Sequence, residues 1–376
     1  MLYNNIIHFK GLNALRFFAA YFVVLHHAEQ IRFKYGLFNL NAYTFFNNGG
    51  IAVIFFFVLS GFLISYLLLK EQHFTKKISV KNFYIKRVLR IWPLYYLLVF
   101  IGLVAIPFLI QKIGYDYEMP YRFKDVILYF VLFCPFSVNM LFGHHLLEPL
   151  WSIGVEEIFY LIWAPVFKFL KKHILFILFG IILLKLLIST TLYYLDINNV
   201  FSQTINVLKF EAMAIGRLGA YYIFNRKKEI DESMFFSKPV QIVFIIYLLL
   251  RLTCVQFLTD NTLFFRILYE TPILSSYLLM FSFIWLIINI SLNKNSVIKL
   301  ENKTLNYFGE ISYGIYMYHM IIIFMLILFL KNFLNDLSPT VSTVVFYFVL
   351  SLLVLFVSFL SKILFEDYFL KLKQKL

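Results

Sequence analysis

The sequence predicts an all-α polytopic membrane protein. Of its 376 residues, 61% are hydrophobic and 20% aromatic, whereas only 14% are charged. The mean hydropathy of +0.80 lies far above that of water-soluble domains. Because a membrane-spanning helix needs about 20 predominantly apolar residues, the chain has room for about ten transmembrane helices. We expect a single transmembrane domain over 1–376 and no separate soluble domain.

Hydropathy marks apolar stretches at about 11–31, 49–69, 88–110, 126–143, 152–170, 173–195, 204–224, 238–258, 266–290, 306–330 and 341–364. The segment 126–143 is the shortest and differs from the others in composition. Its second half contains Pro135, Ser137, Asn139 and Gly143. These residues suit a broken or re-entrant segment buried in protein better than a helix facing lipid. The prediction is therefore about ten crossings plus a re-entrant segment near 126–143.

The distribution of Lys and Arg supports this count, because short cytoplasmic loops collect these residues. If 126–143 enters and leaves on one side, the basic clusters in 70–90 and 168–172 both lie on the inner side. Counting that segment as a crossing would move the later clusters outside. We therefore expect a multi-pass protein of the inner (cytoplasmic) membrane of the cell, with both termini cytoplasmic and the lipid bilayer as a partner.

Several other classes are disfavoured. The net charge of +14 does not indicate a nucleic-acid partner, because the cations punctuate apolar spans and form no basic face on a soluble module. Cys134 and Cys254 each lie inside an apolar run, which supports neither a disulfide framework nor a thiolate site. We expect no metal, because the histidines lack an HExxH arrangement and the neighbours His144 and His145 point in different directions.

The first span, LRFFAAYFVVLHH at 15–27, contains Arg16 and His27. On a helix, residues eleven positions apart lie within about 20° of the same face and about 16 Å apart along the axis. Arg16 and His27 therefore share one face, while His26 points elsewhere. This spacing suits a long substrate with an anionic end near Arg16 and a reacting centre near His27, where a neutral imidazole can deprotonate a hydroxyl. The alternative is that Arg16 reaches the headgroups and His27 only bonds a neighbouring helix.

The segment FYIKRVLRIWPLYY, 83–96, places Arg87 and Arg90 three residues apart, so both can project from one side of a helix. Planar guanidinium groups bind phosphate through two parallel hydrogen bonds. Together with Lys86 they could form a phosphate site on the cytoplasmic face. The alternative is a cationic anchor beside aromatic residues of the interface.

The segment HHLLEPLWSIGVEEIFYLIWAP, 144–165, contains Glu156 and Glu157 within an expected span. A carboxylate there is costly unless it is paired, neutral or facing a wet cavity. Adjacent residues point about 100° apart on a helix, so one of the two is expected to face the bundle interior. It could orient an imidazole or pair with an arginine, and a purely structural ion pair remains an alternative.

Two further segments carry polar groups. KFEAMAIGRLGAYY, 209–222, has Glu211 and Arg217 near Gly216 and Gly219, small residues that let helices approach closely. YFGEISYGIYMYHM, 307–320, ends near His319. Helix packing is the favoured interpretation of both segments.

Together these segments resemble the acyltransferase-3 family of integral membrane O-acyltransferases. Arg16 and His27 resemble its Arg, ten residues, His element, and Arg87 with Arg90 its RxxR element. FFFVLSGFLI resembles the second span of the family, and LWSIGVEEIFY resembles its WSLSVEEQFY-like element. KFEAMAIG is similar to the family's RFDALAIG-like stretch, and ISYGIYMYH is similar to its ISYSLYLWH stretch. The matches follow the family's order over nearly the whole chain. The chain departs from the pattern at Ile158, where Gln is usual.

The resemblance implies transfer of an acyl group, usually acetyl from acetyl-CoA, to a hydroxyl of an extracytoplasmic glycan or lipid-linked saccharide. It also implies about ten crossings and a re-entrant segment after the third. Some family members carry an additional soluble SGNH hydrolase-like domain. Because this sequence stops shortly after its last span, we expect the membrane domain to complete the transfer.

The resulting hypothesis places the phosphates of acyl-CoA on guanidinium and ammonium groups and makes His27 the general base. Glu156 or Glu157 orients His27 or completes an ion pair. The cofactor-binding residues are Arg16, Lys86, Arg87 and Arg90. The residues assigned to the acceptor are Trp151, Ser152, Glu211 and His319. Ser152 is not favoured as a nucleophile, because no base is spaced to activate it.

A second hypothesis is a secondary transporter or flippase for an anionic or lipid-linked glycan, because such proteins also carry Arg, Glu and His within the membrane. The sequence has no paired halves with matching Gly or Pro breaks, which disfavours it. A non-catalytic scaffold would leave the buried charge unexplained.

Overall fold

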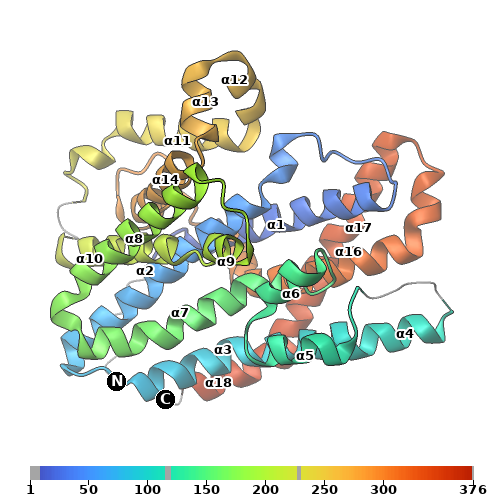
Figure 1. Cartoon of the computed structure of the whole chain (residues 1–376), viewed down its shortest axis with the longest axis horizontal. Helices are drawn as coiled ribbons and strands as arrows, with labels where there is room; N and C mark the ends of the chain where they lie inside the picture. The colour runs from blue at the N-terminus through green and yellow to red at the C-terminus, as the bar shows by residue number, and fades with distance from the viewer. Residues whose placement is uncertain (1–8, 115–119, 227–229, 375–376) are drawn as a thin grey trace.

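The computed structural model describes residues 9–114, 120–226 and 230–374, and within these ranges the chain is helical with no strand (Figure 1). One long helix lies on each predicted crossing. These helices are α1 (Leu12–Lys34), α2 (Gly49–Thr75), α3 (Val80–Phe100), α7 (Leu150–Phe169), α8 (Ile174–Tyr194), α10 (Phe210–Arg226), α11 (Lys238–Thr253), α14 (Pro272–Leu292), α16 (Ser312–Asn335) and α17 (Pro339–Ser361).

Shorter helices connect or extend the long ones. They are α4 (Ile106–Lys112), α5 (Phe123–Val131), α6 (Pro135–Phe142), α9 (Val200–Val207), α12 (Val255–Asn261), α13 (Leu263–Glu270), α15 (Lys303–Glu310) and α18 (Asp367–Gln374). A π-helical turn at Ile101–Ala105 joins α3 to α4, and another at Lys362–Glu366 joins α17 to α18.

Seven helices of the described chain are long and apolar enough to cross a membrane, or up to eight if α11 and α12, bent by 93°, form one span. The predicted class, an all-α polytopic membrane protein, is confirmed, and the count of about ten is approximate. Neither α1 nor α10 is among these helices. α1 carries several charged and imidazole side chains, and α10 has only 17 residues.

The segment 126–143 is broken, as its composition predicts. α5 ends at Val131 and α6 starts at Pro135, and between them Phe133 has a φ of 56°. Two carbonyl groups at the end of α5 accept hydrogen bonds from α3: Tyr95 donates to the Phe130 carbonyl at 3.0 Å and Tyr96 to the Val131 carbonyl at 3.1 Å. Within the break, Phe133 is buried and stacks on Tyr95 of α3 with 4.4 Å between ring centroids, whereas Leu132 is 61% exposed.

α2 and α10 cross with their backbones in contact. A Cβ at Gly216 would lie 2.0 Å from the Val58 carbonyl oxygen, and a Cβ at Gly61 would lie 2.1 Å from the Met213 carbonyl oxygen. Any side chain at either position would force the helices apart. The predicted role of Gly216 in close helix packing is confirmed.

α1 packs against α2, α15 and α16, and α18 lies beside α3 along one edge of the bundle (Figure 1). One end of the bundle collects the cations. There Arg16 is within electrostatic reach of Arg90, and Lys373 is within reach of Lys86 and Arg87. We call this the basic end.

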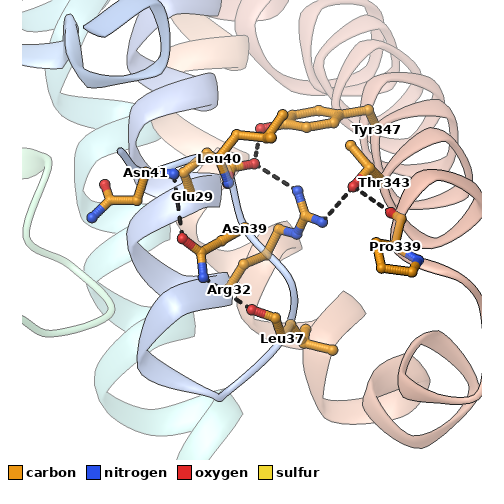
Figure 2. A network of polar contacts seen from close by, with 9 residues as sticks. All are labelled: Glu29, Arg32, Leu37, Asn39, Leu40, Asn41, Pro339, Thr343 and Tyr347. Carbon is orange, nitrogen blue, oxygen red and sulfur yellow. Dashed lines mark hydrogen bonds and ion pairs between the residues drawn. The ribbon is translucent and has the colours of Figure 1, made fainter. Parts of the chain in front are cut away.

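At the opposite end of α1, a buried ion pair ties three segments together (Figure 2). Glu29 and Arg32, which are 0% and 1% exposed, are joined by an Nη1–Oε1 distance of 2.6 Å. Arg32 also donates to Thr343 Oγ1 at 2.9 Å, and Glu29 accepts from the Tyr347 hydroxyl and the Leu40 backbone N–H. We call these five residues the brace. It links α1, the following loop and α17.

Candidate functional site

A cavity of about 310 Å³ lies among α1, α2, α3, α7 and α16, toward the basic end. Its polar lining includes Arg16, Arg87, Arg90, Ser152, Glu156 and Tyr316. We call it the arginine pocket. Five of these six residues are predicted site residues, brought together from three helices that are separated in the sequence.

Three guanidinium groups face this pocket. Arg87 and Arg90 project from one side of α3, as their spacing predicts, and Arg16 joins them from α1. Arg87 Nε is buried without a hydrogen-bond partner in the described part of the chain. Among the described residues, Glu156 supplies the one carboxylate of the lining, which therefore carries an excess of positive charge. An anionic ligand would find unused donors there.

The two adjacent glutamates have separate surroundings. Glu156 lines the pocket, and its Oε2 accepts a hydrogen bond from the Tyr160 hydroxyl at 2.6 Å. Glu157 turns away, and its Oε2 accepts from Trp92 Nε1 at 2.9 Å. Only Glu156 therefore lines the pocket, a choice that the sequence leaves open.

His27 is not among the residues that line the pocket. It lies further along α1 and forms a pair with His319 of α16, with 3.1 Å between His27 Nδ1 and His319 Nε2. His27 Nδ1 also lies 3.0 Å from the Val23 carbonyl oxygen. His26, which was predicted to point elsewhere, packs its ring over Gly49 at the start of α2.

Tyr316 connects the pocket to the imidazole pair. Its side chain lines the pocket, and its hydroxyl donates to the Pro149 carbonyl at 2.8 Å and lies 2.7 Å from Ser152 Oγ. Its backbone carbonyl oxygen lies 2.6 Å from Nδ1 of His319. No sequence pattern indicates this role, because the tyrosine is one of several in an aromatic helix.

Ser152 has no imidazole among its hydrogen-bond partners in the described chain, which are Tyr316 and the Pro149 carbonyl. This geometry agrees with the sequence argument that no base is placed to activate the serine as a nucleophile.

Besides His27, His319 and Glu157, three more predicted site residues lie outside the pocket lining. Trp151 packs edge-to-face against Phe57 with 5.8 Å between ring centroids. Glu211 lies 3.7 Å from the Lys185 ammonium. Lys86 sits on α3 among the cations of the basic end but does not line the cavity. The roles of these residues remain predictions.

Arg217, on α10, is fully buried against α7. Its guanidinium lies 4.0 Å from the Phe159 ring centroid and 3.7 Å from that of Trp163, and none of its three nitrogens has a hydrogen-bond partner in the described chain. The aromatic faces provide its stabilising contacts.

Residues 9–114, 120–226 and 230–374 contain no group of three or more His, Cys, Asp or Glu side chains placed to share a metal ion. Cys134 and Cys254 are both free thiols.

The fold and the pocket define a polytopic membrane protein with a cation-lined cavity, one tyrosine of which also contacts an imidazole pair. The sequence profile of the family described as "Acyltransferase domain" matches residues 9–362. The chain belongs to this family, the acyltransferase-3 family of membrane acyltransferases.

Related proteins are similar over much of the chain. The O-acetyltransferase OatA of Staphylococcus aureus (strain NCTC 8325 / PS 47) is 27% identical over 330 residues, which cover 83% of this chain and 50% of that protein. The peptidoglycan O-acetyltransferase OatA of Listeria monocytogenes is 30% identical over 294 residues, covering 75% of this chain and 46% of that protein. The chain thus spans about half the length of these relatives. No solved structure matches it.

Proposed function

We propose that the chain is an O-acyltransferase that moves an acyl group, acetyl in the first instance, from cytoplasmic acyl-CoA to a hydroxyl of an extracytoplasmic or lipid-linked glycan. Membership of the acyltransferase family supports the reaction class. The names of the relatives, which include a peptidoglycan O-acetyltransferase, support acetyl as the group and a glycan as the acceptor. The observation that carries the proposal is the convergence of Arg16, Arg87 and Arg90 on one cavity.

The donor end of the reaction fits the arginine pocket. Coenzyme A carries phosphate groups, which guanidinium groups bind through charge-assisted hydrogen bonds. The volume of about 310 Å³ is at the lower end of the range of about 300–1,000 Å³ for small-molecule sites. The cavity therefore suits the thioester and the chain attached to it, with the phosphates held by Arg87 and Arg90 at the basic end, which we place in the cytoplasm.

The chemical step requires a base near the thioester carbonyl. In the proposal, His27 takes the proton of the acceptor hydroxyl while the hydroxyl oxygen attacks the thioester carbonyl carbon. The carbon–sulfur bond breaks, and the departing sulfur takes up the proton from the His27 imidazolium. Tyr316 and Ser152 line the pocket, and the Tyr316 carbonyl contacts His319, so the proposal places the path of the acyl group toward His27 beside these two residues.

The glycan approaches from the end of the bundle opposite the arginines, so that donor and acceptor meet within the protein. In this arrangement the protein lies in the inner membrane with both termini cytoplasmic. Glu156 bonds Tyr160 and faces the arginines, which suits it to balance their charge while the phosphates are absent.

The test uses the purified chain in lipid vesicles with labelled acetyl-CoA and a soluble peptidoglycan fragment as acceptor. We expect release of CoA and appearance of label on the glycan, with a loss of about 10²–10⁴-fold in His27→Gln. His144→Gln removes an exposed imidazole of the loop before α7 and serves as the matched control. Movement of the glycan across the membrane without consumption of thioester would instead establish a transporter, and full activity of His27→Gln would exclude the assigned base.

A further inference from the structure

His319 lies far from His27 in the sequence, yet its ring nitrogen contacts the ring of the proposed base. The two residues are 292 positions apart, and His319 is 0% exposed. A histidine ring can present one nitrogen as a donor and the other as an acceptor, and the bond made by one nitrogen decides the state of the other. The contacts of both rings therefore determine which nitrogen of His27 is free to act.

The protonation of His319 follows from its neighbour. Its Nδ1 lies 2.6 Å from the Tyr316 carbonyl oxygen, which can only accept a hydrogen bond. Nδ1 must therefore carry the proton. In the neutral ring, Nε2 then carries a lone pair, and this lone pair points at His27.

The same reasoning applies to His27. Its Nδ1 lies 3.0 Å from the Val23 carbonyl oxygen and 3.1 Å from His319 Nε2, and both of these atoms are acceptors. The proton of the neutral His27 ring is therefore on Nδ1. The opposite pair of tautomers would set a nitrogen lone pair against a carbonyl oxygen at both His27 and His319, which is repulsive in each case.

We propose that His319 is a positioning residue that holds His27 as the Nδ1–H tautomer, so that His27 Nε2 is the atom that accepts the proton from the acceptor hydroxyl. When Nε2 takes that proton, the Nδ1–H bond to His319 becomes a charge-assisted bond and stabilises the imidazolium. His319 replaces the carboxylate that often orients a catalytic imidazole, and it adds no negative charge to a buried site. This inference rests on the proposed function for the identity of the base.

The first experiment reads the tautomer directly and needs no activity. The chain is labelled with ¹⁵N-histidine in lipid nanodiscs, and the His27 signals are assigned by their absence in His27→Gln. We expect a protonated Nδ1 and an unprotonated Nε2 at neutral pH in the wild type. A protonated Nε2 would overturn the proposal, whether or not the chain proves to be an acyltransferase.

The second experiment separates orientation from bulk. The amide oxygen introduced by His319→Gln can replace the acceptor lone pair, so this variant is expected to retain kcat within a few-fold. His319→Leu is expected to lose about 10–100-fold in kcat, by analogy with the partners that orient metal-binding histidines. The KM for acetyl-CoA should stay unchanged in both variants, because His319 is outside the arginine pocket. Equal kcat values in the wild type and His319→Leu would overturn the proposal, whereas absence of activity in the wild type itself would reject the proposed function.

Discussion

Two charged clusters in this protein, one buried and one lining a cavity, differ in how completely their hydrogen bonds are satisfied. In the brace, the Glu29 carboxylate receives donors from Arg32, Tyr347 and Leu40 (Figure 2). In the arginine pocket, three guanidinium groups share one lining carboxylate, and Arg87 Nε has no partner in the described residues. A cluster whose hydrogen bonds are complete holds helices together, whereas one with unused donors beside a cavity is suited to a ligand.

The physical reason is the cost of charge in apolar surroundings. A buried ion of one sign must be matched by an ion or by hydrogen bonds, or it destabilises the fold by several kcal/mol. The brace supplies this compensation from within the protein. In the pocket, part of the compensating charge and hydrogen bonding must come from water or from an anionic ligand. Substitutions in the two clusters should therefore have opposite effects on the stability of the fold.

The largest effect is expected in the brace. Arg32→Leu leaves the Glu29 carboxylate buried without its cation, and breaking such a pair costs about 3–5 kcal/mol. We expect a strongly lowered unfolding temperature of the protein in detergent. The double variant Glu29→Leu with Arg32→Leu removes both charges and should recover much of the loss. Equal destabilisation by the single and the double variant would show that packing around Arg32, including its contact with the Phe346 ring at 5.0 Å, is what matters.

A smaller effect, and one on ligand affinity, is expected in the pocket. Arg87→Gln and Arg90→Gln should each weaken acetyl-CoA binding by about 10–100-fold, because hydrogen bonds to charged groups contribute about 1.5–3 kcal/mol. The unfolding temperature should stay the same or rise, since each change removes a cation from a crowded set. Equilibrium binding in nanodiscs measures the affinity.

Lys81→Gln is the matched control for these variants, because it removes an exposed cation from the same helix, outside the pocket lining. If Lys81→Gln weakened binding as much as Arg87→Gln, the general charge of the basic end would explain the affinity, and no specific phosphate site would be needed.

The features that the sequence predicts are those that local patterns determine. Hydropathy places the long helices, the residues near Pro135 predict the broken segment, and the spacing of Arg87 and Arg90 predicts their common face. The adjacency of Glu156 and Glu157 predicts that one of them faces the bundle interior, but the rotation of α7 decides that Glu156 lines the pocket.

The features that the sequence misses depend on contacts between distant segments. Glu29 and Arg32, three residues apart, resemble an ordinary surface pair until α17 and the loop after α1 enclose them. The contact between His27 and His319 requires α1 and α16 to meet in one register. Periodicity describes a single helix, so neither partnership could be derived from it.

The smallest expected effect concerns His145. It tests whether an imidazole whose hydrogen bonds are all made within the protein has only a structural role. His145, in the turn between α6 and α7, is 4% exposed, and its Nδ1 accepts from the Leu147 backbone N–H at 3.1 Å while its Nε2 lies 2.7 Å from Asn139 Oδ1. Burial, followed by the neighbouring His144, lowers the pKa of His145 to about 3. The folded protein therefore keeps this ring neutral.

Because the unfolded chain binds this proton with an ordinary pKa of about 6.5, it holds more protons than the fold between about pH 3 and 6.5, and stability falls as the pH drops through that window. We expect a loss of less than about 1 kcal/mol in the free energy of unfolding between pH 7 and pH 6.

Burial raises the pKa of Glu148, and this shift changes stability in the opposite direction at lower pH. The contribution of His145 is therefore measured by comparing the wild type with a variant. In His145→Asn, whose side-chain oxygen can still accept from the Leu147 N–H, the unfolding temperature should depend less on pH than in the wild type. An unchanged pH dependence would contradict the titration assigned to His145. A loss of acyl transfer with normal stability would instead show that His145 has a functional role, although its hydrogen bonds are satisfied.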